Sequence, residues 1–154
     1  MITIKEETII ESVTRVTASQ EVNSPKAEEN MATKYWLVGA TEDSGTGTDR
    51  SPEWYKKGIW KLMWDEGEKP IQDARLDKMK VGDRIAIKSM NGQGAKDITI
   101  KAIGIIHTFD REERTAYITW VLTGLKRVVD SGGCFSAIHG PYKSNNWIRR
   151  IFTL

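Results

Sequence analysis

The chain has 154 residues, of which 39% are hydrophobic and 29% charged, a composition typical of one soluble globular domain and not of a disordered protein. No apolar run approaches the roughly 20 residues of a membrane-spanning helix, and the first residues lack a signal-peptide pattern, so we expect a cytoplasmic protein with no membrane partner. The net charge is only +2, and the single cysteine, Cys134, excludes an intrachain disulfide and a cysteine-based zinc site.

The charge is unevenly distributed. Residues 1–33 hold three basic residues against six glutamates, so the rest of the chain carries a net charge of +5. From Lys126 onward five basic residues face only Asp130. This excess is compatible with an anionic partner such as nucleic acid. A solvated surface accounts for the same pattern, so charge alone does not decide.

The first third of the chain divides into two parts. Apolar residues between positions 9 and 16 recur near helical spacing, and residues 19–30 form a polar linker with one proline. From residue 34 the sequence pattern changes, because "KYWLVGA" predicts a short strand. We therefore expect an N-terminal extension over 1–33 and one domain over 34–154.

Alternating apolar and polar residues predict several strands in that domain. After the first strand, a loop rich in turn formers leads to a helix with Pro52 in its first turn, and residues 65–79 form a loop or short helix. Further strands are expected within 80–90, 98–109 and 115–129, with "NGQGAKD" as a hairpin turn. A long loop, 130–146, then precedes a final strand, which lies within 147–152.

These elements predict a fold class. The expected fold is α+β but mostly β: a largely antiparallel curled sheet or small barrel of about five to six strands, with short helices inserted.

The sequence offers no clear reaction centre. His107 and His139 lack the spacing of a metal pair, and the glycine-rich stretches lack the ending of a phosphate-binding loop. Cys134 and His139 are a conceivable nucleophile and base, but no third group that would orient them is evident. We therefore expect a protein that is not an enzyme and that uses neither a metal nor a cofactor.

The unusual feature is "EWYKKGIWKLMW", residues 53–64, which holds three of the six tryptophans among lysines. Tryptophans of a small domain usually fill its core, and for Trp36 and Trp120, inside strand patterns, we expect that role. For Trp60 two interpretations stay open, a core position and the wall of a binding pocket. Trp147 is expected to pack against the domain.

Five stretches, "KYWLVGATED", "KKGIW", "MKVGDRIAIKS", "IKAIGIIH" and "AYITWVL", occur in an order that resembles the PUA-like superfamily, in particular EVE and YTH domains. The combination is also similar to the N-terminal specificity domains of McrB-type restriction systems. The resemblance covers residues 34–125, and "YWLVGA" and "MKVGDRIAIKS" carry most of it. It implies a domain that accepts a flipped nucleobase in a pocket beside the sheet.

The resemblance also implies site residues. The base-binding pocket would be built from the tryptophan segment, the end of the first strand, the end of the "RIAIKS" strand and one phenylalanine: Trp60 as an aromatic wall, Lys61 through its backbone, Gly39, Ala40, Thr41, Ser89 and Phe109, with Trp54 and Trp64 at the rim. YTH domains place further tryptophans after the glycine-containing strand, whereas this chain has only Phe109 there. Phosphate contacts are expected from four basic residues: Lys88, Lys143, Arg149 and Arg150.

The resulting hypothesis is a non-enzymatic reader of a flipped and modified (methylated) base. DNA is favoured over RNA, and the setting is restriction or another form of DNA defence, with a separate ATPase or nuclease as partner. Two alternatives stay open: an RNA-binding PUA-like module without preference for modified bases, and an adaptor for a nucleotide-like ligand or another protein.

Overall fold

The computed structural model describes residues 32–42 and 47–154. Within it, Thr33–Leu154 form one compact unit. The helical spacing expected over 9–16 and the linker over 19–30 lie outside the described residues. None of the helices in this part of the chain is long and apolar enough to cross a membrane.

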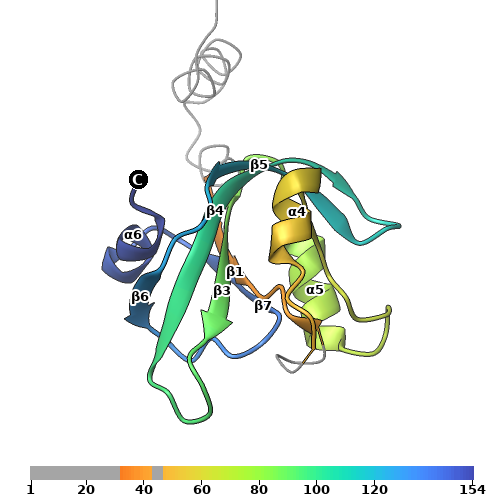
Figure 1. Cartoon of the computed structure of the whole chain (residues 1–154). Coiled ribbons are helices and arrows are strands. Elements are labelled where there is room, and N and C mark those ends of the chain that lie inside the picture. The colour runs from red at the N-terminus through yellow and green to blue at the C-terminus, as the bar shows by residue number, and fades with distance from the viewer. Residues whose placement is uncertain (1–31, 43–46) are drawn as a thin grey trace, which may run out of the picture. The chain divides into compact units, whose positions relative to one another are not determined.

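The described chain is mostly β, with short helices before and after the longer strands (Figure 1). This confirms the predicted fold class. In chain order the elements are β1 (Tyr35–Val38), α4 (Ser51–Lys57), β2 (Ile59–Lys61), α5 (Pro70–Lys78), β3 (Arg84–Met90), β4 (Asp97–Asp110), β5 (Thr115–Leu122), β6 (Arg127–Asp130), β7 (Ile138–Tyr142) and α6 (Asn146–Phe152).

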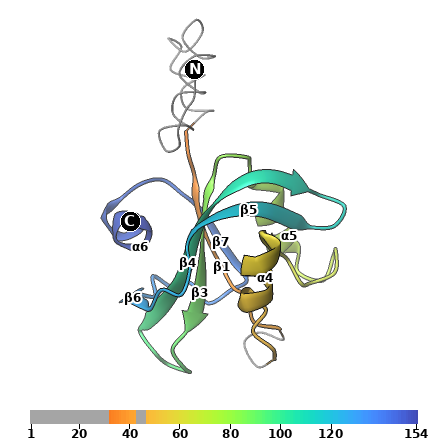
Figure 2. The ribbon, with the colours of Figure 1, turned by 45° about the horizontal axis from the view of Figure 1, so that its top comes forward.

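The strands form one curled sheet in the order β2-β5-β4-β3-β1-β7, and β6 pairs with the first part of β4. All pairs are antiparallel except β1 with β3, which run parallel. Register shifts interrupt the pairing of β4 with both β3 and β5. Such bulges bend a strand and increase its twist, and the sheet visibly curls around the long β4 (Figure 2).

The sheet buries apolar side chains on both faces. Along β1, Trp36 and Val38 belong to the cluster under α4 and α5, whereas Leu37 belongs to the cluster under α6. This alternation follows from the two-residue period of a strand. Helix α6 accordingly lies on one side of the sheet, and α4 and α5 lie on the other (Figures 1 and 2).

The turn before β3 is anchored by a buried carboxylate. Asp83 is 4% exposed and accepts hydrogen bonds from the Trp36 indole N–H at 2.9 Å, the Lys80 backbone N–H at 3.0 Å and the Lys34 backbone N–H at 3.3 Å. These bonds join the Lys-Val-Gly-Asp turn to β1. They explain why a polar residue is buried here and why Trp36 is fully buried, as its position in the strand pattern predicted.

Three sequence expectations were wrong or incomplete in the second half of the chain. The expected last strand within 147–152 is the helix α6, because the Asn145 side chain accepts the Ile148 N–H at 2.8 Å and Ile148 and Ile151 are both buried. The expected strand over 115–129 is divided into β5 and β6 around Gly124, which has a φ of 69°. The expected loop over 130–146 contains β7.

Candidate ligand-binding cavity

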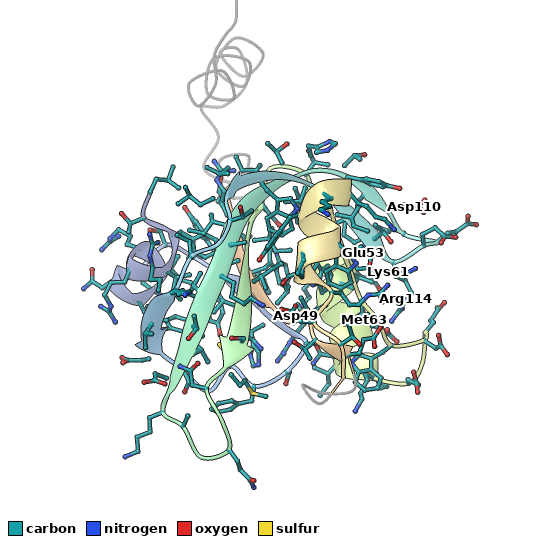
Figure 3. The ribbon with its side chains drawn as sticks, viewed as in Figure 1. Asp49, Glu53, Lys61, Met63, Asp110 and Arg114 are labelled. Atoms are coloured by element: carbon teal, nitrogen blue, oxygen red, sulfur yellow. The ribbon has the colours of Figure 1, made fainter. Side chains whose placement is uncertain are left out.

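A cavity of about 1600 Å³ opens beside the curled sheet. It is larger than the roughly 300–1,000 Å³ of a typical small-ligand site. Its walls come from segments far apart in the sequence: the end of β1, the α4–β2 segment, the end of β3, the glycine-rich β3–β4 hairpin, the β4–β5 turn and residues 135–137. On one wall, Lys61, Met63 and Arg114 lie near one another beside α4 (Figure 3).

Most of the predicted pocket residues meet at this cavity. Its lining includes eight of the nine: Gly39, Ala40, Thr41, Trp54, Trp60, Lys61, Trp64 and Ser89. Phe109 does not line the cavity; it packs against the core under the Arg111 guanidinium, 4.7 Å from the ring centroid. The structure therefore brings the predicted segments together, and the roles of the single residues remain predictions.

Of the two interpretations left open for Trp60, the structure favours the core position over an exposed pocket wall. The side chain is 1% exposed and belongs to the core cluster. Its indole N–H donates to the Gly39 carbonyl oxygen at 2.8 Å, and this bond ties the ring to the end of β1 at the cavity. In β2, Trp60 alternates with the exposed Lys61, and this alternation turns the tryptophan to the core.

Trp54, expected at the rim, is also a core residue. It is 3% exposed, and its carbonyl oxygen accepts the Trp120 indole N–H at 3.2 Å. Trp120 packs edge-on against Tyr55, with ring centroids 5.3 Å apart, and is partly buried against the core as predicted. This group of rings fixes α4 on the sheet.

The apolar side chains that are accessible at the cavity are different ones. Trp64 is half-buried, and Phe135 is 51% exposed. Met63 and Met90, both partly exposed, also line the cavity. Sequence reasoning missed Phe135, because a single aromatic residue in a glycine-rich loop carries no periodic signal.

The position of Trp64 is fixed by Arg114. The Arg114 guanidinium donates to the Trp64 carbonyl oxygen through Nε at 3.1 Å and Nη2 at 2.7 Å, and to the Asp73 carboxylate at 2.7 Å. Asp73 lies on α5 and also accepts the Gly67 N–H, and these two hydrogen bonds lower the pKa of its carboxyl group. The Lys69 ammonium lies 4.6 Å from the centroid of the Trp64 ring.

Charges of both signs surround the mouth of the cavity. Lining cations are Arg50, Lys61, Lys69, Lys88 and Arg114, and lining acids are Glu42, Asp65, Glu112 and Glu113. Two of the cations are engaged within the protein, Arg50 with Glu42 and Glu53, and Arg114 with Asp73. The net charge of the residues that line the cavity is therefore only weakly positive.

Lys88 was expected to contact phosphate, but its burial does not suit an open phosphate-binding surface. It is a cavity-lining residue of β3 but is only 5% exposed, and it pairs with Ile100, which belongs to the cluster under α6, so its side chain does not lie on an open surface. Burial lowers the pKa of its ammonium group to about 8. Among the described residues it donates no hydrogen bond and forms no ion pair.

The other three expected phosphate contacts lie elsewhere. Lys143, Arg149 and Arg150 do not line the cavity. Arg149 and Arg150 border a separate shallow hollow on α6, and Arg149 donates to side chains of its own segment. Trp147 packs edge-on against Tyr142, with centroids 5.4 Å apart, in line with its expected packing role.

Cys134 and His139 are not arranged as a nucleophile and base. The buried Cys134 sulfur lies 3.4 Å from the Tyr142 hydroxyl, and burial raises the pKa of the thiol. His139 Nε2 accepts the Ser136 N–H at 3.0 Å, and burial, together with the charges of Lys88 and Arg75, lowers the pKa of this imidazole to about 4. Within residues 32–42 and 47–154, no group of three His, Cys, Asp or Glu side chains could hold a metal ion.

No protein-family model matches the chain, and no curated protein matches it. The resemblance to PUA-like domains therefore remains a hypothesis from the sequence.

Proposed function

We propose that the chain is a PUA-like reader domain that binds nucleic acid and accepts one flipped base in the cavity. The observation that carries the proposal is the convergence of eight predicted pocket residues on one cavity, although they come from three separate segments of the sequence. The curled sheet, which the strand pattern predicted and which is compatible with a PUA-like domain, supports it further.

The size and lining of the cavity suit such a ligand. A flipped base loses stacking worth a few kcal/mol, and an aromatic side chain can return about 1–3 kcal/mol per base. With Trp60 in the core, we assign this contact to Trp64 and Phe135, which are the accessible aromatic residues in the lining. The volume leaves room for the base and part of its backbone.

The partner is taken to be DNA with a modified base in a defence system, in which a separate ATPase or nuclease acts after recognition. This setting comes from the likeness to McrB-type specificity domains. The mixed charge at the mouth predicts that phosphate contacts contribute modestly, so that binding weakens with salt less steeply than for proteins making 6–10 phosphate contacts.

The test is a fluorescence-anisotropy titration of the full chain with labelled duplexes that contain 5-methylcytosine, 6-methyladenine or no modification. Trp64→Ala and Phe135→Ala should each weaken binding by about 5–150-fold, the equivalent of about 1–3 kcal/mol. Tyr117→Ala is the matched control, because Tyr117 is 36% exposed but does not line the cavity. It should change the affinity less than twofold.

Equal affinities for the three variants would contradict the proposal, as would the absence of binding to every duplex. Structured RNA that outcompetes the modified duplexes would favour an RNA-binding module. Binding of a free nucleotide without any binding of nucleic acid would favour an adaptor for a small ligand.

A further inference from the structure

Most of the net positive charge of the domain lies around α6 and not at the cavity. Residues 126–154 hold five basic residues and one acid, so they account for a net charge of +4 out of the +5 in residues 34–154. The cavity lining, in contrast, contains five cations and four acids. β6 and α6, which carry three of these five basic residues, lie side by side (Figures 1 and 2). An anionic partner is therefore attracted more strongly to this part of the surface than to the mouth of the cavity.

Helix α6 has a buried and an exposed face. Ile148 and Ile151 are fully buried under the helix, within the apolar cluster on this side of the sheet. The exposed face borders a shallow hollow of about 410 Å³, which is lined by four polar residues: Asn146, Arg149, Arg150 and Thr153. We call these four residues the α6 surface. Each of them carries a hydrogen-bond donor, and arginine, asparagine and threonine are among the side chains that contact phosphate oxygens in protein–DNA complexes.

Both arginines of the α6 surface remain accessible. Arg150 forms its one ion pair among the described residues with Asp130 at 3.9 Å, and the two side chains are 56% and 81% exposed. An exposed ion pair contributes little to stability, so an anionic ligand can readily replace Asp130. Arg149 donates to the Ser144 hydroxyl at 3.4 Å and to the Asn146 amide oxygen. Since a guanidinium has five N–H donors, further donors of Arg149 are left for a ligand.

The negative end of α6 is compensated by a third arginine. The Arg127 guanidinium donates to the Ile151 carbonyl oxygen at 2.8 Å and to the Thr153 carbonyl oxygen at 2.7 Å. Free carbonyl groups at the C-terminal end of a helix carry a partial negative charge, which would repel an anion. Arg127 neutralises that charge and adds a cation beside the α6 surface.

We infer that the α6 surface is a second nucleic-acid contact, which binds the phosphate backbone of DNA irrespective of sequence and modification. Arginine can bind a phosphate group through two parallel donors of its planar guanidinium, and Arg149 and Arg150 border the same hollow. α6 lies on the opposite side of the sheet from α4 and α5, which contribute to the cavity lining, so this contact is separate from the base pocket (Figure 2). The choice of DNA among anionic partners rests on the proposed function, but the contact needs no base in the cavity.

The test is a fluorescence-anisotropy titration of the full chain with the unmodified duplex and with the duplexes that contain 5-methylcytosine or 6-methyladenine, at about 50 and about 200 mM salt. Each phosphate contact contributes about 0.9 to the slope of log K against log[salt]. Arg149→Gln combined with Arg150→Gln should therefore reduce the slope by about 1.8 and weaken the binding of every duplex by at least about tenfold at the lower salt concentration. The ratio of the affinities for modified and unmodified DNA should stay unchanged.

Two further double variants serve as controls. Lys78→Gln combined with Lys80→Gln removes two exposed cations that line neither the cavity nor the hollow on α6, so it matches the loss of charge and should change the slope by less than about 0.5. Arg149→Lys combined with Arg150→Lys keeps the charges but loses the planar guanidinium groups, so it should retain the slope while its affinity falls between those of the wild type and the glutamine variant. All four side chains are exposed, so the urea midpoints of the variants should equal that of the wild type.

The outcomes separate this inference from the proposed function. An unchanged slope in the glutamine variant, or an equal loss of slope in the Lys78 and Lys80 control, refutes the α6 contact and leaves the base pocket standing. If every duplex binds with the same affinity and Trp64→Ala has no effect, while the glutamine variant loses the salt-dependent binding, the reader function fails and the α6 contact stands. Absence of binding to every duplex overturns the inference, and binding of poly-glutamate in its place would indicate an acidic protein partner.

Discussion

Replacing Trp60 with phenylalanine distinguishes a core tryptophan from one that contacts a ligand. The substitution removes two ring carbons and the indole nitrogen from a side chain that is 1% exposed. Two buried carbons contribute about 1.6 kcal/mol at about 0.8 kcal/mol each, and the lost hydrogen bond to the Gly39 carbonyl contributes about 1 kcal/mol. We therefore expect Trp60→Phe to lower the free energy of unfolding by about 2.5 kcal/mol.

The assay is urea unfolding followed by circular dichroism. With a slope of about 1–3 kcal/mol per molar urea, the midpoint should fall by about 0.8–2.5 M. Trp64→Phe is the matched control, since the same three atoms are removed from a half-buried ring at the cavity, and its midpoint should move by less than half as much. If Trp60→Phe leaves the stability unchanged but weakens nucleic-acid binding more than tenfold, the core assignment is refuted, since the Trp60 ring would then contact the ligand.

Three further predictions concern the fold. Gly104→Ala should destabilise the protein by about 1–3 kcal/mol in urea unfolding, because the new Cβ would clash with Ile118 Cγ2 and lie 3.0 Å from the Thr119 carbonyl oxygen. The control is Gly39→Ala, whose Cβ meets nothing within 4 Å, and it should change stability by less than about 0.5 kcal/mol. Equal effects of the two substitutions would contradict the close packing at Gly104. Asp83→Ala should lower the melting temperature and reduce the free energy of unfolding by about 2–4 kcal/mol, because the Trp36 indole N–H and the Lys80 N–H lose their acceptor. Asp83→Asn keeps one oxygen and should reduce it by less. An alanine variant as stable as the wild type would show that Asp83 does not anchor the turn. The pKa of His139 is about 4 in the folded protein and about 6.5 in the unfolded chain, so the unfolded state binds more protons between these pH values. The free energy of unfolding should therefore fall as pH is lowered from about 6.5 to about 4. In His139→Gln this part of the pH dependence should disappear, and an unchanged pH profile would exclude His139 as its source.

The strands that could be predicted are those with isoleucines at every second position beside clear turn residues. β3, with Ile85 and Ile87, and the first half of β4, with Ile98 and Ile100, are joined by the glycine-rich hairpin, so their pairing could be predicted, but the register shift after Ile87 could not. The C-terminal segment could not be resolved in this way, because "WIRRIF" fits a strand as well as a helix. The Asn145 cap and the i, i+3 spacing of Ile148 and Ile151 were the signals for the helix.

The sequence predicted which segments line the cavity, but not which side chains are exposed there. Alternation in β2 places Trp60 and Lys61 on opposite faces of the sheet, but the sequence does not say which face meets the core. Lys88 was expected at the surface because a lysine is almost never fully buried without a partner. Its burial depends on the end of the β1–β3 pairing and on the loop that carries Cys134, which are contacts between distant parts of the chain.

The three hydrogen bonds of Arg114 make the Trp64 wall and α5 a single mechanical unit. The guanidinium fork links the backbone after β2 to the side chain of Asp73, and its planar geometry could not be reproduced by lysine. Moving the backbone at Trp64 therefore requires either that these bonds break or that α5 moves with it.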